Sequence, residues 1–147
     1  MEIKKVEQSD LMACAKEMSE AFKVEPWKEN WTVEQAYRRF DEIMSAKNAL
    51  GYCMYDHEQV ICTVVGRVMT YLDYKEYNID DFSVLPSYQG QGIGSKMIEY
   101  IRSDLKGVEY FTLTTHADYP SVSFYTKNGI ELSKEIVFMN GKVKKEG

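Results

Sequence analysis

One stretch of this sequence, FSVLPSYQGQGIGSKMIEYI over residues 82–101, constrains the fold more than any other. An apolar run ends at Pro86, three glycines follow at positions 90, 92 and 94, and an amphipathic pattern of helical spacing then begins. Glycines let successive backbone N–H groups point into one concavity, and the positive end of the following helix also attracts anions. The stretch therefore predicts a strand, a phosphate-binding turn and a helix, although such turns also occur where a helix merely packs closely on a sheet.

The remaining segments predict a chain of alternating helices and strands. Thr32 and Gln35 form a capping-box pattern ahead of the second helix, and the polar residues 71–76 are expected to interrupt the sheet. Strand, helix and strand over residues 77–115 predict two parallel neighbouring strands. The expected helices cover residues 11–22, 33–44, 95–105 and 120–128, and the expected strands cover residues 2–7, 51–55, 60–69, 77–84 and 108–115, with closing strands at 129–132 and 135–143.

Composition limits the classes of function. A chain of 147 residues with 44% hydrophobic content fits one domain over residues 1–147. The net charge of -5 and the absence of a long basic block argue against nucleic acid as a ligand. No apolar signal region or membrane-length segment is found, so we expect a cytoplasmic protein with no membrane partner. Three cysteines without paired spacing predict reduced, buried thiols and no metal site.

Two familiar phosphate-binding loops do not fit the glycine stretch. A P-loop needs a lysine and then a serine or threonine directly after its last glycine, but here Ser95 precedes Lys96. A dinucleotide-binding loop needs a third glycine at the position that Ser95 occupies, and it usually opens its own strand–helix–strand unit. A nucleotide-binding domain is therefore disfavoured.

A different sequence pattern does fit this stretch. Gln89-Gly90-Gln91-Gly92-Ile93-Gly94 matches the pattern [Q/R]-x-x-G-x-[G/A], and it resembles the acetyl-CoA-binding motif of the GNAT superfamily of N-acetyltransferases. Downstream, DYPSVSFYTKNGI over residues 118–130 resembles a second signature of that family, with Phe124, Tyr125, Lys127 and Gly129 in register. Asp118, Ser121 and Ile130 depart from it, standing where asparagine, alanine and phenylalanine are usual.

The resemblance implies a fold class and a coenzyme. The fold would be α/β, or α+β in layer terms: a GNAT-like single domain whose mixed, mostly antiparallel central sheet has a central parallel strand pair flanked by helices. Backbone N–H groups of the glycine loop would bind the pyrophosphate of acetyl-CoA, and the strand edge at Phe82 and Val84 would pair with its pantetheine arm. The implied coenzyme-binding residues are Phe82, Val84, Gln89, Gly90, Gln91, Gly92, Ile93, Gly94, Ser95 and Asp118.

Transfer to an amine needs a base and an acid. An alkylammonium with a pKa of about 10.4 is neutral in only about one molecule in two thousand at pH 7, so a base or a water chain must remove its proton. Strand alternation places Asp80 on the same side as Phe82 and Val84 and directs Asp81 away from it, which favours Asp80. Tyr125 matches the family position of the general acid for the departing thiolate.

The acceptor site is expected in two loops, KVEPWKENW and TYLDYKEY. Acidic and aromatic side chains there could attract and stack on a small cationic amine, and EPWKENWT is similar to segments of small acetyltransferases that modify aminoglycosides. The predicted acceptor-binding residues are Glu25, Trp27, Trp31, Tyr71 and Asp73.

Three alternatives stay open. The acceptor could be a protein lysine or N-terminus, or the chain could be a GNAT-like module that senses an acyl-CoA without transferring it. The short closing strands leave an edge that a second copy could cover, so a homodimer is possible.

Overall fold

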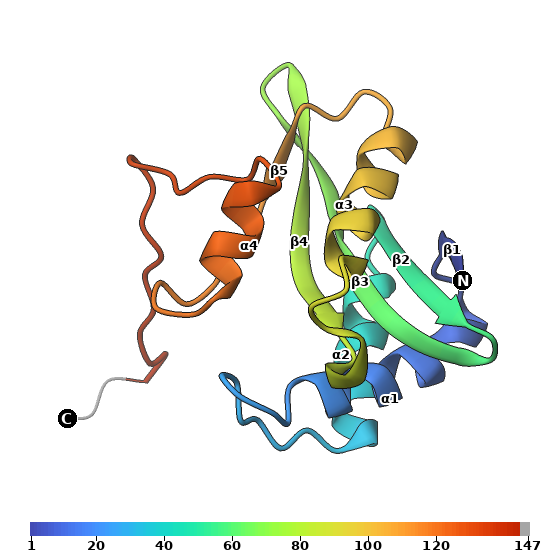
Figure 1. Ribbon diagram of the computed structural model, residues 1–147. Coiled ribbons are helices and arrows are strands. Elements are labelled where there is room, and N and C mark those ends of the chain that lie inside the picture. The colour runs from blue at the N-terminus through green and yellow to red at the C-terminus, as the bar shows by residue number, and fades with distance from the viewer. Residues whose placement is uncertain (145–147) are drawn as a thin grey trace. The chain divides into compact units, whose positions relative to one another are not determined.

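The computed structural model describes residues 1–144, and the described chain divides into two compact units, one over residues 1–113 and one that begins at Thr114. In the first unit the elements are β1 (Glu2–Lys5), the 3₁₀ helix η1 (Gln8–Asp10), α1 (Leu11–Ala21), α2 (Val33–Met44), β2 (Ala49–Asp56), β3 (Gln59–Tyr71), β4 (Tyr74–Val84), the 3₁₀ helix η2 (Pro86–Tyr88), α3 (Ile93–Asp104) and β5 (Tyr110–Thr112). The second unit contains α4 (Ser121–Lys127). Figure 1 shows these elements along the chain.

The five strands form one mixed sheet in the order β1-β2-β3-β4-β5. Neighbours are antiparallel except β4 and β5, which are parallel, so the predicted mixed and mostly antiparallel sheet is confirmed. The parallel pair lies at one edge of the described sheet and not at its centre. The expected interruption over residues 71–76 is wrong, because Tyr71 pairs with Tyr74 across a tight turn that continues the ladder.

Helices cover both faces of this sheet (Figure 1). Side chains alternate between faces along a strand, so consecutive residues enter different cores. Tyr52 and Val64 pack with Ile93, Met97 and Ile101 of α3. Cys53 and Val65 belong to the second core, with Leu11 and Cys14 of α1 and Phe40 of α2. The predicted capping box is confirmed, because Thr32 and Gln35 exchange hydrogen bonds at the start of α2.

A β-bulge interrupts the pairing of β3 with β4. Val65 stands opposite Asp81 and Gly66 opposite Ile79, so Asp80 is an extra residue on β4. The two backbones approach so closely here that a Cβ atom on Gly66 would lie 2.0 Å from the carbonyl oxygen of Asn78. Only glycine fits at this position, and it fixes the place where β4 bends.

The predicted closing strands are wrong for the described residues. Within 128–144 no strand is formed, although both runs have the apolar composition of strands. An extended segment becomes a strand only when its N–H and C=O groups pair with a neighbour. In the described part of the second unit α4 is the regular element, so that unit offers these runs no strand to pair with. This absence also leaves the parallel pair at the edge of the described sheet.

We expect Gly66→Ala to destabilise the protein by about 3 kcal/mol, because the new methyl group must displace backbone atoms of β4. The matched control is Gly141→Ala, where an added Cβ meets no atom within 4 Å. Urea unfolding of both variants measures the difference. An unfolding free energy of Gly66→Ala equal to that of the control would contradict the close approach of β3 and β4.

Candidate active site

The loop between β4 and α3 has the backbone that the glycine pattern predicts. Gly90 and Gly92 have φ angles of 77° and 78°, values that disfavour residues with a Cβ atom. A Cβ atom at either position would meet nothing within 4 Å, so these glycines serve the backbone conformation and not close packing. The alternative in which the glycines only let α3 approach the sheet is therefore disfavoured at positions 90 and 92.

Two glutamine side chains brace this loop. Nε2 of Gln89 donates to the carbonyl oxygen of Val84 at 3.0 Å, and Nε2 of Gln91 donates to the carbonyl oxygen of Ser87 at 3.1 Å. The first bond ties the loop to the end of β4. Both side chains are directed at the loop's own backbone, so contacts from Gln89 and Gln91 to an anion would come from their N–H groups.

The start of α3 is arranged to receive an anion. Gly92 is the N-cap of α3 and supplies no side-chain cap to the first turn. The first N–H groups of any helix have no acceptor within the helix, and the helix dipole adds partial positive charge at the same end. The glycine loop and the start of α3 together fit a phosphate-bearing ligand.

The pairing of β4 with β5 ends just before the bulge. They pair in parallel only from Glu76 to Asn78, and from Ile79 onward the paired neighbour of β4 in the described sheet is β3. Phe82 and Val84, the residues predicted to contact pantetheine, lie on this later part of β4 and pack against the core under α3. The predicted strand edge thus follows directly from the short pairing with β5.

Both aspartates at the bulge are bound by arginine. Asp81 accepts two hydrogen bonds from Arg39 of α2, at 2.7 and 3.0 Å. Asp80 accepts two from Arg67, both at 3.2 Å, and a third from Nδ2 of Asn78 at 3.1 Å. Burial raises the pKa of Asp81 above its ordinary value, although the guanidinium of Arg39 opposes this shift.

The predicted opposite orientation of these aspartates is wrong. Arg67 follows Val65 by two residues on β3 and therefore shares its face, which is the face covered by α1 and α2. Asp80 binds this Arg67, and Asp81 binds Arg39 of α2. The extra residue at the bulge breaks the alternation, so both carboxylates serve the same side of the sheet.

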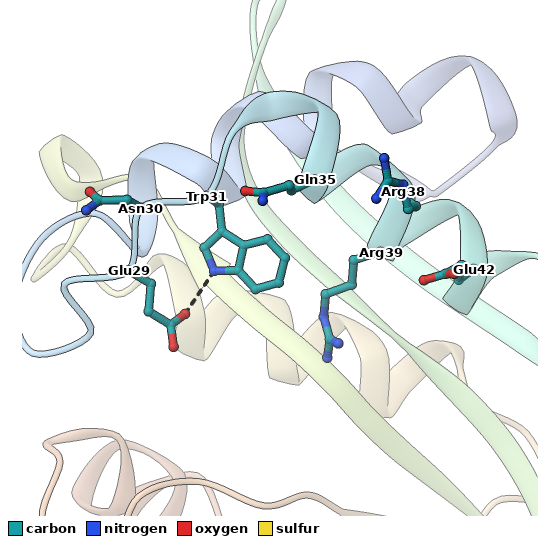
Figure 2. Close-up of a pocket in the computed structure, with 7 residues that line it drawn as sticks. All are labelled: Glu29, Asn30, Trp31, Gln35, Arg38, Arg39 and Glu42. Carbon is teal, nitrogen blue, oxygen red and sulfur yellow. Dashed lines mark hydrogen bonds between the residues drawn. The ribbon is translucent and has the colours of Figure 1, made fainter.

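A pocket of about 590 Å³ lies on this side, between the α1–α2 loop and α2. Figure 2 shows the ring of Trp31 between Glu29 and Arg39. The indole Nε1 of Trp31 donates to Oε1 of Glu29 at 2.9 Å, which fixes the ring plane. The residues that line the pocket are Glu29, Asn30, Trp31, Gln35, Arg38, Arg39 and Glu42.

Of the five predicted acceptor-binding residues, Trp31 lines this pocket. Trp27 instead packs edge-to-face on Phe22 with ring centroids 5.3 Å apart, and Glu25 forms an ion pair with Lys28 at 2.9 Å. These contacts tie both side chains into the α1–α2 loop itself.

The other two predicted acceptor residues lie at the far end of the sheet. Tyr71 and Asp73 belong to the β3–β4 hairpin tip, where Tyr71 packs on Tyr74. This tip and the α1–α2 loop lie at opposite ends of the sheet (Figure 1). The structure therefore does not bring the two predicted acceptor loops together.

Tyr125 and Asp118 belong to the second unit. Tyr125 lies on α4, which begins after Pro120 and ends at Asn128 and Gly129, as the sequence predicts. The Tyr125 ring packs against Phe124, with centroids 5.1 Å apart. Asp118 lies in the turn before α4 and is exposed. Their roles stay predictions.

Sequence reasoning missed the two arginines. Arg39 lies on the polar side of the α2 pattern and Arg67 follows the buried part of β3, positions that are usually solvated. The available signal was the pair Asp80-Asp81 between the apolar residues Ile79 and Phe82, because adjacent carboxylates near a core require cationic partners.

Other chemistries find no support in the described chain. Cys14, Cys53 and Cys62 are free and buried, as predicted. Burial raises the pKa of Cys62 well above its ordinary value, which disfavours a thiolate. Residues 1–144 contain no group of three or more histidine, cysteine or acidic side chains placed to hold a metal ion. In the same residues no helix is both long and apolar enough to cross a membrane.

Solved structures share this architecture. A possible acetyltransferase from Clostridium difficile 630 is similar with a TM-score of 0.80 at 12% identity, over 97% of this chain and 98% of that one. The aminoglycoside antibiotic 6'-N-acetyltransferase AAC(6')-IG from Acinetobacter haemolyticus is similar with a TM-score of 0.74 at 15% identity, over 98% of this chain and 100% of that one. At these identities the likeness concerns the fold.

One curated relative and one family model match the sequence. The tRNA(Met) cytidine acetyltransferase TmcA of Saccharolobus islandicus is 40% identical over 55 residues, which cover 37% of this chain and 7% of that much longer protein. The model of the acetyltransferase (GNAT) family matches residues 13–130, which include the glycine loop, both bulge aspartates and Tyr125. This chain therefore belongs to the GNAT family of acetyltransferases.

Proposed function

We propose that this chain transfers the acetyl group of acetyl-CoA directly to the primary amine of a small cationic acceptor, such as an aminoglycoside or a polyamine, with residues 1–147 acting as one domain. The observation that carries the proposal is the positive-φ glycine loop at the start of α3, beside the part of β4 that β5 leaves at the bulge. The strand edge and the anion site follow one another along the chain, just as the pantetheine arm and the pyrophosphate follow one another along acetyl-CoA.

Acetyl-CoA supplies a thioester, whose carbonyl carbon is the electrophile. The residues that would hold the phosphates of this coenzyme are those of the loop from Gln89 to Gly94 with Ser95, through their N–H groups. The open space at Gly90 and Gly92 supports the fit, because a ligand can approach the backbone there without meeting a side chain. The N–H of Val84 is proposed to polarise the thioester carbonyl, as an oxyanion hole does.

The proton of the incoming ammonium needs an acceptor. Asp80, Asp81 and a water chain are the candidates, and the sequence favours Asp80. Both carboxylates lie on the face of the sheet that carries the pocket, and Arg39 both binds Asp81 and lines the pocket. This arrangement supports a role of these carboxylates in removing the proton. Burial raises the pKa of Asp81, which makes that carboxylate a stronger base than an aspartate in water. Tyr125 is proposed to give its phenolic proton to the departing thiolate.

The pocket supports a cationic acceptor. Glu29, Glu42 and the nearby Asp81 set three carboxylates against the guanidinium groups of Arg38 and Arg39. The Trp31 ring adds an aromatic face, which attracts alkylammonium groups and packs on sugar rings. Because the lining carboxylates of Glu29 and Glu42 can pair with ammonium groups beside this ring, the pocket supports a polyamine or amino sugar as the acceptor.

Acetyl-CoA at saturating concentration should raise the melting temperature of the wild-type protein. Gly92→Ala should lose most of this rise, because its left-handed backbone is strained by a side chain and the loop then misplaces its N–H groups. Gly107→Ala is the matched control, since Gly107 also has a positive φ of 69° and open space around it but lies after α3. The rise in melting temperature on adding acetyl-CoA is measured for both variants. An equal rise in Gly92→Ala and Gly107→Ala would exclude the loop as the coenzyme site.

Mass spectrometry should detect one added acetyl group on an acceptor when the protein is incubated with acetyl-CoA. The panel contains polyamines, aminoglycosides, amino acids and lysine peptides, and a reaction without protein is the control. Product in the polyamine or aminoglycoside set supports the proposal. Product only on peptides would replace it by protein acetylation, and coenzyme binding without any product would favour the sensing module.

With the acceptor identified, Tyr125→Phe should lower kcat by about 100-fold, because the thiolate then departs without a general acid. The dissociation constant of acetyl-CoA should change less than twofold, since the ring is kept. Steady-state kinetics and calorimetry measure the two quantities, with Tyr110→Phe, an exposed tyrosine of β5, as the control. An unchanged kcat would remove Tyr125 from the chemistry.

A further inference from the structure

A glutamate is buried beneath the proposed coenzyme strand. Glu17 lies on α1, and only 2% of its surface is exposed. Its Oε1 accepts a hydrogen bond of 2.8 Å from the hydroxyl of Ser83 on β4. Neither the family motifs nor the proposed mechanism uses this residue. A carboxyl group in such a position is costly unless it is neutral or fully paired.

Two further polar atoms are buried at this place. Within the described chain, neither Oε2 of Glu17 nor Oγ1 of Thr63 has a hydrogen-bond partner. Thr63 on β3 stands directly opposite Ser83 in the β3–β4 register, and its hydroxyl lies close enough to Glu17 to influence the pKa of that carboxyl. One hydrogen bond between these two atoms, donated by the hydroxyl of Thr63 or by a proton on Oε2, satisfies both of them.

Among residues 1–144, no cationic side chain lowers the pKa of this carboxyl group. The pKa of Glu17 is raised to about 8, chiefly by burial and also by the carboxylate of Asp81 on β4, while the hydroxyls of Thr63 and Ser83 oppose the shift. At pH 7 the carboxyl group is therefore protonated in about nine molecules of ten. The positive charge of Arg39, from α2, is already bound by Asp81.

The other titratable groups around this carboxyl are neutral or already paired. Cys62 of β3 and Cys14 of α1 are buried thiols, and the pKa of Cys62 is raised well above its ordinary value, first by burial. Asp10 of η1, which precedes α1, is bound by Lys4 and by the hydroxyl of Tyr55. A comparison with Glu17→Gln therefore separates the titration of Glu17 from that of its neighbours.

We propose that Glu17 is a positioning residue for coenzyme binding: as a neutral carboxylic acid it bridges Ser83 of β4 and Thr63 of β3, and so holds the strand that pairs with pantetheine. The proposal rests on the acetyl-CoA function argued above. Ser83 lies between Phe82 and Val84, whose edge is proposed to receive the coenzyme, so a movement of Ser83 moves that edge. When Glu17 ionises, a negative charge lies next to Asp81 beneath β4, and the two carboxylates repel each other.

Calorimetric binding of acetyl-CoA between pH 6.5 and pH 9.5 tests this role. Wild-type affinity should be constant up to about pH 7.5 and about tenfold weaker at pH 9 than at pH 7, since only the protonated form holds the strand correctly. Glu17→Gln keeps one acceptor and one donor but does not titrate, so its affinity should not change with pH. Glu20→Gln, an exposed glutamate three residues along α1, should follow the wild type.

Urea unfolding across the same pH range tests the protonation without the coenzyme. The pKa of Glu17 is higher in the folded chain than in the unfolded chain, so the folded state holds a proton that unfolding releases. Relative to Glu17→Gln, the wild-type unfolding constant should therefore rise about tenfold per pH unit between about pH 5 and pH 8, and then level off. A ratio that does not change with pH would overturn the neutral carboxyl.

The outcomes separate the two proposals. Acetyl-CoA binding with the same pH profile in wild type and Glu17→Gln leaves the function intact and overturns the role of Glu17. If no variant binds acetyl-CoA at any pH, the function and the positioning role both fall. Should Glu17→Gln not fold, Ser83→Ala gives the test from the strand side: its unfolding should still report the titration, whereas its acetyl-CoA affinity should no longer follow it, and a retained pH profile of affinity would overturn the coupling.

Discussion

The close approach of Gly66 to the carbonyl oxygen of Asn78 is the constraint on which the site depends. It sets the position of the bulge, where Asp80 is an extra residue of β4 with no residue of β3 opposite it in the ladder. Because of that extra residue, Asp80 and Asp81 both meet arginines on the face of α1 and α2. The pairing of β4 with β5 also ends just before the bulge, at Asn78. One missing side chain thus decides where carboxylates gather and where a strand edge becomes available.

Three acidic residues near this bend are stabilised in two different ways. Asp80 and Asp81 are held by guanidinium groups, whose forked donors match a carboxylate. Glu17 is deeper and has no cation, so its surroundings favour the protonated form. A buried charge needs a partner, and a buried acid without one gives up its charge. The chain uses both solutions within one strand and the helix packed on it.

The sequence predicted the features that depend on local chemistry. The glycine loop, the capping box of Thr32 and the end of α4 at Asn128 each follow from residues close together in the chain, and each is present in the structure. It failed where tertiary contacts decide. Alternation misplaced Asp80 because the bulge depends on a cross-strand approach, which residues close together in the chain do not reveal. Glu17 gave no signal, since a glutamate in a helical pattern usually faces water.

The two glutamine bonds of the glycine loop have a consequence for how quickly and how tightly a ligand can be captured. A loop that is free to move loses conformational entropy when a ligand orders it, and that loss weakens binding. Here the side chains of Gln89 and Gln91 tie the loop to Val84 and Ser87. The ordering takes place during folding, so the coenzyme proposed for this loop would meet a preformed site, and diffusional encounter rather than loop rearrangement would set its association rate.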